Sequence, residues 1–373
     1  TVVHDTRGDA GEAANGYRRL AADPGIVAVL GPMLSWEAAA VRNETTIAGL
    51  PAVSFSQRAF PPGPPFYRFS MSKEDQVVAL AGYLVSELGL ARWAILHPDD
   101  AFGSDMSLLF RDRVESLGGR VAAVVSYEPR QTDFQKEVQQ LQARIGVRHE
   151  KEGPLELFVD GIFLPDSVER VQLLAPTLAF FDIRGVTLAG THGWNDGAKL
   201  LQALPYVDGS IFVDGFFLYS FFPPVRSFVN AFRDAYGSDP GILEAYGYDA
   251  AMLLLEEIDA GAVERRRMIE HMHRPRLRAG ATGWTTRTAT GELQKQLFLL
   301  TVKEGTIREI ERAQPPEPPP VARPVLPVPA VPTRKPGTGY WKRPEFDSRA
   351  PGTLGEPPPV PILPPQSATP NGR

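Results

Sequence analysis

Short apolar runs alternate with amphipathic stretches over residues 1–312, and this alternation predicts strands and helices in turn. The apolar runs that predict strands cover residues 27–30, 51–55, 93–96, 121–127, 157–162, 185–189 and 210–217. The amphipathic stretches that predict helices cover residues 35–47, 76–88, 105–117, 133–145, 167–181 and 195–203. Strands that are apolar on both faces and separated by helices indicate parallel sheets covered on both sides. The sequence therefore predicts an α/β fold of the doubly wound kind.

The pattern changes after residue 217. Helices follow one another from about residue 224 to residue 273. Two further strands are then predicted at residues 283–287 and 296–303, with turns at residues 290–292 and 304–305. Short strands joined by such turns indicate antiparallel hairpins at the edge of a sheet.

Proline dominates residues 313–373, which hold about half of the 36 prolines in the chain. Because proline fixes φ and has no amide hydrogen, neither a helix nor a sheet runs through such a segment. We predict a disordered proline-rich C-terminal tail with extended, polyproline-like conformations. Aromatic and charged residues interrupt this tail at 340–346, where they form either a docking motif or an aromatic remnant in a linker.

Length and composition restrict the classes of protein. The 373 residues are enough for two domains, and a net charge of −5 gives no reason to expect nucleic acid or an anionic membrane as a partner. The chain has no cysteine, which excludes disulfides, zinc-thiolate sites and cysteine nucleophiles. No apolar run approaches the roughly 18 residues of a transmembrane segment. The chain starts without a signal peptide, so we interpret it as a mature protein or as a fragment of a longer one.

Polar side chains follow two of the predicted strands, at the positions where open α/β sheets bind ligands. Residues 31–35 lead from one strand into a helix, and residues 54–58 end the next strand. The side chains offered there are those of Ser35, Ser54, Ser56, Gln57 and Arg58. Together with amides at the helix start they would hold an anionic group such as a carboxylate. The alternative is that the serines only cap turns, with Ser35 capping the helix that begins there.

A second group of candidates follows later strands. It consists of Phe102, Phe163, His192 and Trp194. The acidic pair Asp99 and Asp100, just before Phe102, is interpreted as turn residues and helix-start charge rather than as a metal site. His192 has no second histidine at a useful spacing, so neither a metal nor any cofactor is predicted.

Signatures of catalysis are missing from the sequence. There is no Gly-x-Ser-x-Gly elbow, Walker A loop, Gly-x-Gly-x-x-Gly fingerprint or His-Glu-x-x-His motif. A pair of carboxylates assembled in space stays open as a hydrolytic alternative, although no pattern favours it. We therefore expect a protein that is not an enzyme.

The order of these segments over residues 1–312 resembles the type 1 periplasmic binding proteins, particularly the branched-chain amino acid receptor group. The segments that carry the resemblance are residues 27–32, 49–54, 67–70, 98–103, 118–119 with 133–134, and 245–250. The resemblance implies two doubly wound parallel-sheet lobes, of which the family's first strand and helix would precede Thr1. The first lobe would take residues 1–89 and 217–275, and the second residues 90–216 and 276–312.

The resemblance also implies a function. The protein would be a non-catalytic, periplasmic, solute-binding protein that holds a small polar ligand, an amino acid or a related compound, between its lobes. The lobes would close over the ligand by a hinge motion, and an ABC permease would be the partner in transport. Where amino acid receptors place an acidic residue for the ligand's ammonium group, this chain has His192.

A closer likeness is to the penicillin-binding protein activators, which have a module of this fold. Residues 178–180, 193–195 and 212–217 carry it. It implies an envelope lipoprotein, anchored through a segment that precedes Thr1, which regulates peptidoglycan synthesis by contact with a penicillin-binding protein. The helical repeats that often precede this module in such proteins do not occur in this sequence. This role is the alternative to ligand transport.

Overall fold

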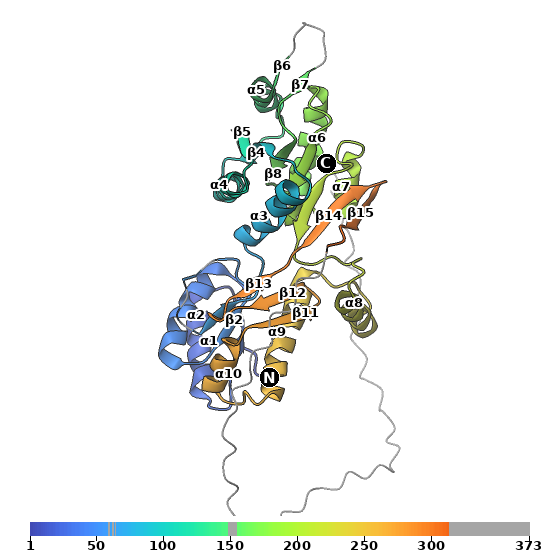
Figure 1. Cartoon of the computed structure of the whole chain (residues 1–373). Helices are drawn as coiled ribbons and strands as arrows, with labels where there is room; N and C mark the ends of the chain where they lie inside the picture. The colour runs from blue at the N-terminus through green and yellow to red at the C-terminus, as the bar shows by residue number, and fades with distance from the viewer. Residues whose placement is uncertain (59, 62, 64, 148–154, 313–373) are drawn as a thin grey trace, which may run out of the picture. The chain divides into compact units, whose positions relative to one another are not determined.

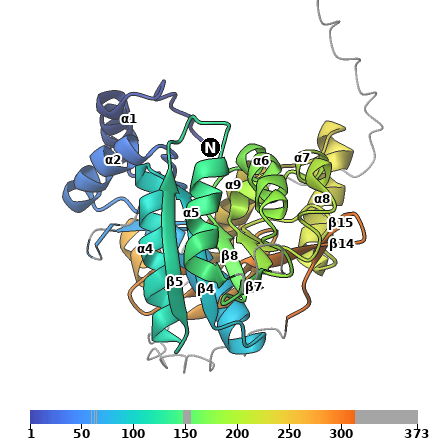
Figure 2. The same ribbon diagram turned by 90° about the horizontal axis from the view of Figure 1, so that it is seen from above.

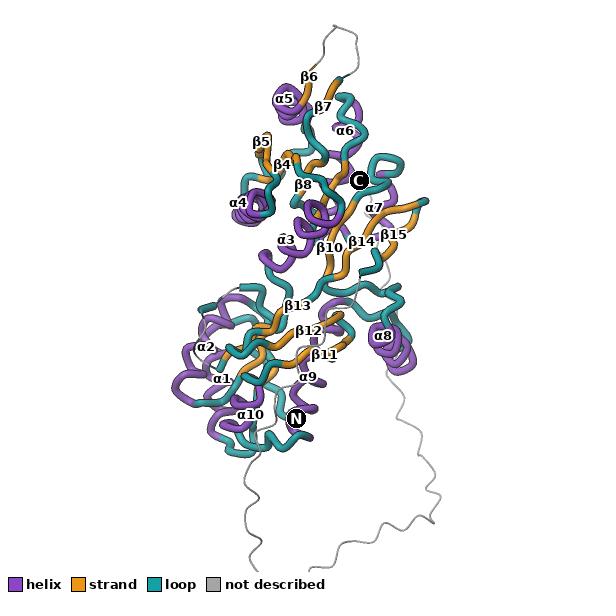
Figure 3. Tube along the Cα trace, viewed as in Figure 1, coloured by secondary structure: helices purple, strands orange, loops and turns teal. Residues whose placement is uncertain are grey.

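The computed structural model describes residues 1–312 except residues 59, 62, 64 and 148–154. The predicted disordered tail and its aromatic segment at 340–346 therefore lie outside the described residues. Figure 1 shows the described elements with their labels, and Figure 3 shows the same elements coloured by type.

Helices and strands alternate along most of the chain. The α-helices are α1 (Ala10–Ala22), α2 (Ser35–Ala48), α3 (Lys73–Ala81), α4 (Ala101–Ser116), α5 (Gln135–Ile145), α6 (Val168–Phe180), α7 (Gly197–Leu200), α8 (Pro223–Tyr236), α9 (Ile242–Asp259) and α10 (Arg265–Met272). A π-helical stretch (Gly82–Glu87) continues α3, and two short 3₁₀ helices are η2 (His192–Trp194) and η3 (Leu201–Ala203). The strands are β1 (Val29–Leu30), β2 (Ala52–Ser54), β3 (Phe66–Arg68), β4 (Arg92–Pro98), β5 (Arg120–Tyr127), β6 (Gly146–Val147), β7 (Glu156–Leu157), β8 (Gly161–Leu164), β9 (Thr187–Gly190), β10 (Ile211–Asp214), β11 (Arg276–Gly280), β12 (Gly283–Arg287), β13 (Leu293–Lys295), β14 (Phe298–Lys303) and β15 (Thr306–Glu309).

The largest sheet has seven strands in the order β15-β14-β10-β9-β8-β4-β5. Strands β5, β4, β8, β9 and β10 are parallel, and β14 and β15 form an antiparallel hairpin at the edge next to β10. Successive residues of β4 enter different cores: Ala94 and Leu96 pack with α5 and α6, while Trp93 and Ile95 pack with α3 and α4. The sheet is thus covered on both faces, as the apolar strands predicted. Figure 2 shows these helices around the strands.

A smaller parallel sheet has the order β1-β2-β3. Helices α1 and α2 pack beside it around Tyr17, Val41 and Leu50, all of them buried. The hydroxyl of Tyr17 donates a hydrogen bond to the carbonyl oxygen of Leu50 and so ties α1 to the start of β2. These two parallel sheets confirm the predicted doubly wound α/β class.

Several predicted helix starts were wrong, and side-chain caps explain why. Helix α3 begins at Lys73 because Ser72 and Asp75 form a capping box, with Ser72 Oγ accepting from Asp75 N at 2.9 Å. Helix α4 begins at Ala101 because the Asp100 carboxylate accepts from Gly103 N at 2.7 Å. Ser35 does not cap α2; the cap position is Leu34, and Ser35 is the first helical residue.

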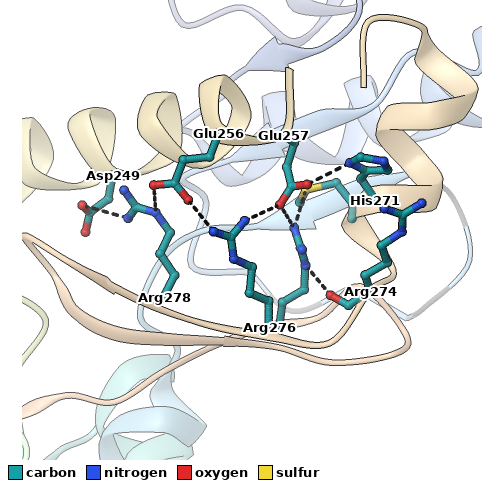
Figure 4. Close-up of polar contacts among 9 residues, drawn as sticks. Asp249, Glu256, Glu257, His271, Arg274, Arg276 and Arg278 are labelled. Carbon is teal, nitrogen blue, oxygen red and sulfur yellow. Dashed lines mark hydrogen bonds and ion pairs between the residues drawn. The ribbon is translucent and has the colours of Figure 1, made fainter. Parts of the chain in front are cut away.

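The third sheet, β11-β12-β13, is antiparallel, and ion pairs attach it to α9 (Figure 4). Arg278 on β11 contacts Asp249 at 3.3 Å and Glu256 at 2.9 Å. Glu257 accepts from Arg287 Nη1 at 2.8 Å. The carboxylates all come from α9, so one helix carries the acidic half of the network.

Glu257 is the most connected of these carboxylates. Besides Arg287 it contacts Arg276 on β11 at 3.3 Å and His271 Nδ1 on α10 at 2.9 Å. Burial by itself raises the pKa of Glu257, but Arg287 and the hydrogen bonds to it outweigh burial, so the pKa lies below its usual value. The carboxylate is therefore ionised at neutral pH and holds β11, β12 and α10 on one helix.

These ion pairs cross the predicted boundary between the two lobes. The resemblance placed α9 in the first lobe, with residues 217–275, and residues 276–312 in the second. The paired side chains instead join β11 and β12 to α9, and β11–β13 make no ladder with the seven-stranded sheet among the described residues. The predicted boundary at residue 275 does not follow these contacts, and the division into lobes stays a prediction.

We predict that Glu257→Gln lowers the free energy of unfolding by about 3 kcal/mol, because it leaves the buried Arg287 without its counter-charge. The matched control is Glu256→Gln, one residue earlier on α9, whose side chain is 30% exposed against 4% for Glu257. We expect the control to lose about 1 kcal/mol or less. Urea unfolding followed by circular dichroism measures both. Equal losses in the two variants would show that burial of the pair does not matter.

Candidate functional site

Three of the predicted serines meet at the carboxyl end of β2. Ser54 Oγ donates to the carbonyl oxygen of Pro32 at 2.7 Å and accepts from Ser56 N at 3.1 Å. Ser56 Oγ lies 3.2 Å from Ser35 Oγ, at the first residue of α2. Ser54 and Ser56 are buried, and Ser35 is half-buried. The structure therefore brings Ser35, Ser54 and Ser56 together, as their positions at the strand ends predicted; we call them the serine group.

Gln57 and Arg58 lie beside the serine group but are exposed. The backbone amide of Arg58 donates to Ser56 Oγ at 3.1 Å. Its guanidinium lies over the ring of Phe60, 5.4 Å from the ring centroid. This cation–π contact holds the arginine side chain at the surface.

His192 binds a residue that the sequence did not single out. Gln76 Oε1, on α3, accepts from the backbone N of His192 at 3.2 Å and from its Nδ1 at 2.9 Å. Gln76 Nε2 donates to the carbonyl oxygen of Ser72 at 3.3 Å, which fixes the orientation of the amide. Burial lowers the pKa of His192. At neutral pH the imidazole is therefore uncharged, with Nδ1 as donor and Nε2 as acceptor.

Phe102 lies next to His192. Their ring centroids are 6.4 Å apart in an edge-to-face arrangement. Lys73 Nζ lies 5.4 Å from the centroid of the Phe102 ring and pairs with Asp105 at 2.6 Å. The first turns of α3 and α4 thus contact each other beside Phe102. The structure brings Phe102 and His192 together, as predicted positions, and places two further side chains there, Lys73 and Gln76.

Phe163 and Trp194 are buried in the cores. Phe163 stacks on Phe110 with ring centroids 4.1 Å apart, under α4. Trp194 packs on Phe212 and so closely on Gly190 that a Cβ atom there would overlap the indole ring. Neither side chain has exposed surface: Phe163 lies on β8 and Trp194 on η2, and both are fully buried. We leave these two residues out of the candidate site.

One short segment links the serine group to His192. Ser70 Oγ donates to the carbonyl oxygen of Ser56 at 2.7 Å, and six residues later Gln76 holds His192. The backbone amide of Met71, between them, donates to Tyr246 Oη at 3.1 Å. The candidate site therefore has two parts at the two ends of residues 70–76. The capping-box pattern at residues 72–75 could have located the start of α3, but no local pattern predicts a contact between residues 76 and 192.

The segments that suggested an activator are bound to each other. Asn195 Nδ2 donates to Asp214 Oδ2 at 2.7 Å and to the carbonyl oxygen of Phe216 at 3.2 Å. Burial raises the pKa of Asp214 to about 7. Residues 193–195 and 212–217 are thus hydrogen-bonded to each other at the end of β10.

Among the described residues, no three His, Cys, Asp or Glu side chains gather in a way that could hold a metal ion. Within the same part of the chain, no helix has the length and apolar character needed to cross a membrane.

The sheets define the class of protein: the chain has the parallel-sheet lobes of the type 1 periplasmic binding protein fold. A family model described as periplasmic binding protein matches residues 1–306, so the chain belongs to that family. Membership implies a periplasmic or extracytoplasmic location. No curated protein matches the chain.

Solved structures share this fold. A protein from Rhodospirillum rubrum, described as a branched-chain amino acid ABC transporter, is 24% identical with a TM-score of 0.72 over 82% of this chain and 86% of that one. A branched-chain amino acid transporter substrate-binding protein from Streptococcus pneumoniae, in complex with isoleucine, is 20% identical with a TM-score of 0.57 over 85% and 87%. A solute-binding protein from R. palustris in complex with benzoate is 18% identical with a TM-score of 0.57 over 82% of each chain. The likeness to penicillin-binding protein activators stays a prediction.

We predict that Asp214 makes stability fall as the pH rises. A folded pKa of about 7, above the usual 3.8, means that the folded protein binds a proton more tightly than the unfolded chain. The stabilisation is fully present below the unfolded pKa of 3.8 and is lost as the pH rises through about 7. Asp214→Asn removes this dependence, whereas the exposed Asp208→Asn retains it. Urea unfolding at several pH values from 5 to 8 measures it, and parallel profiles for wild type and Asp214→Asn would contradict the prediction.

Proposed function

We propose that this protein is a non-catalytic solute-binding protein of the periplasm that holds a small polar ligand, an amino acid or a related carboxylate, between two lobes. The single observation that carries the proposal is the two-part arrangement at the ends of residues 70–76, with the serine group at one end and His192 at the other. The serine group offers hydrogen-bond donors, and His192 offers an acceptor beside the ring of Phe102. This arrangement suits a ligand that has a carboxylate at one end.

The carboxylate would bind at the serine group. Ser35 and Ser56 hydroxyls lie 3.2 Å apart, so one of them can turn its hydrogen towards an anion. Ser35 also begins α2, whose cap residue Leu34 makes no side-chain hydrogen bond to the first turn. Amides of that turn therefore remain as donors for a carboxylate, and the helix dipole favours a negative charge there.

The other end of the ligand would meet His192 and Phe102. Neutral His192 with Nδ1–H bound to Gln76 leaves Nε2 as a hydrogen-bond acceptor. An ammonium or hydroxyl group could donate to it, and apolar ligand surface would pack on Phe102. Because the imidazole is uncharged, an ammonium group is accepted but not required. Related folds that hold isoleucine in one case and benzoate in another support this range of ligands.

Closure of the lobes over the ligand would present the protein to an ABC permease, which we propose as its partner. Anchoring as a lipoprotein stays a prediction. For the alternative, regulation of a penicillin-binding protein by contact, no observation among the described residues gives support, since the segments that suggested it bind each other.

Calorimetric titration with amino acids, simple carboxylates, short peptides and muropeptides tests the proposal. We expect a ligand with a carboxylate to bind, and Ser56→Ala to weaken it by about 5- to 30-fold, since one hydrogen bond to a charged group is lost. Ser116→Ala is the matched control, because Ser116 is exposed at the end of α4. Unfolding curves show whether each variant is folded. The proposal would be overturned if no ligand of the four groups bound, or if Ser56→Ala bound the ligand as tightly as the wild type.

A further inference from the structure

A cavity of about 250 Å³ lies where the start of β12, the connection into β14, the end of β15 and the start of α8 come together. Its lining includes Phe221, Phe222, Trp284, Gln296, Glu309 and Arg312. The lining contains none of the serine group, Gln76, Phe102 or His192, so this cavity is separate from the candidate site.

Aromatic rings form two adjoining walls. Phe222 and Trp284 have ring centroids 5.5 Å apart, and their planes are inclined by 48°. Phe221 also lines the cavity and is 51% exposed, so one side opens to solvent. The face of an aromatic ring carries partial negative charge and attracts a cation within about 6 Å.

Acceptors complete the lining. Glu309 takes a hydrogen bond from Ser220 Oγ at 2.5 Å and is half-buried. Burial raises the pKa of Glu309, and the like charge of Glu311 adds to this, although hydrogen bonds from Ser220 and from the backbone of Phe221 lower the pKa in part. The carboxylate lacks a cationic partner among the described residues. Gln296 Oε1 is buried without a hydrogen-bond partner there. A bound cation would compensate the half-buried negative charge at Glu309.

The positive groups at the cavity are already compensated. Arg312 pairs with Glu87 at 2.9 Å. The start of α8 would favour an anion, but its first two residues, Pro223 and Pro224, have no amide hydrogens. The amide of Phe222 donates to Ser220 Oγ at 3.1 Å. The balance of the lining therefore favours a positive ligand.

We propose that this cavity is a second ligand site, which binds a small organic cation such as a quaternary ammonium group. The cation would lie against Phe222 and Trp284, with its charge facing Glu309. Ring faces recognise such a group without hydrogen bonds.

Titration of the full chain with choline, followed by calorimetry and tryptophan fluorescence, tests the proposal. The neutral probe 3,3-dimethylbutan-1-ol has the same shape, with carbon in place of the charged nitrogen. We expect choline to bind and the neutral probe to bind at least about tenfold more weakly, as a desolvated cation–π contact implies. Trp284→Leu and Glu309→Gln should each weaken choline about tenfold. Trp36→Leu, at an exposed tryptophan on α2, should leave choline affinity unchanged.

Three outcomes would overturn the proposal. If choline does not bind at millimolar concentrations, the cavity is not a site for organic cations. Equal binding of choline and the neutral probe means that the cavity selects apolar shape and not charge. Loss of choline binding in Ser56→Ala, with full binding in Trp284→Leu, places choline at the serine group instead. Because choline has no carboxylate, this test is also independent of the ligand proposed for that group.

Discussion

Tyr246 on α9 holds the three segments in which the chain passes between the smaller sheets and the seven-stranded sheet. Its hydroxyl accepts from Met71 N at 3.1 Å, after β3. It lies so close to Gly215, after β10, that a Cβ atom there would be 2.5 Å from Oη. Lys295, before β14, places its Nζ 5.8 Å from the centroid of the Tyr246 ring. Both proposed ligand sites adjoin these contacts of Tyr246: residues 70–76 carry both ends of the candidate site, and Gln296, which lines the cavity, follows Lys295.

A buried lysine joins this meeting point to the ion pairs of α9. Lys295 Nζ lies 3.4 Å from the centroid of the Phe69 ring and donates to Thr282 Oγ1 at 2.7 Å. The hydroxyl of Thr282 in turn donates to Asp249 at 2.6 Å. Burial lowers the pKa of Lys295 to about 7. The polar network that attaches β11–β13 to α9 therefore extends to Phe69, in the segment that leads from β3 to α3. A displacement of that sheet would disturb the candidate site through Phe69 and its neighbour Ser70.

The sequence predicts what is local in this fold and misses what is not. The parallel strands were predictable because both faces of β4 are apolar, and the β14–β15 hairpin was predictable from its turn. Helix α1 was not predicted, since its inward positions are mainly alanine and glycine, although Asp9 caps it by accepting from Glu12 N. The positions of Ser35, Ser56 and His192 were predicted from strand ends, and their role in binding stays a prediction. The burial of Phe163 was not predicted, because a strand end gives position along the chain and not the direction of the side chain. Gln76 was missed because its partner is 116 residues away.

The turn at residues 192–195 holds His192 in one orientation. Trp194 is fully buried, and Asn195 is bound to Asp214 and to the backbone of Phe216. Both backbone and ring of His192 then donate to one oxygen of Gln76. A side chain held in this way has already lost its rotamer freedom before a ligand arrives, so binding does not have to supply that ordering cost. An uncharged imidazole that its neighbours hold in place can select a ligand by the direction of the hydrogen bond, with less penalty for a ligand that lacks an ammonium group.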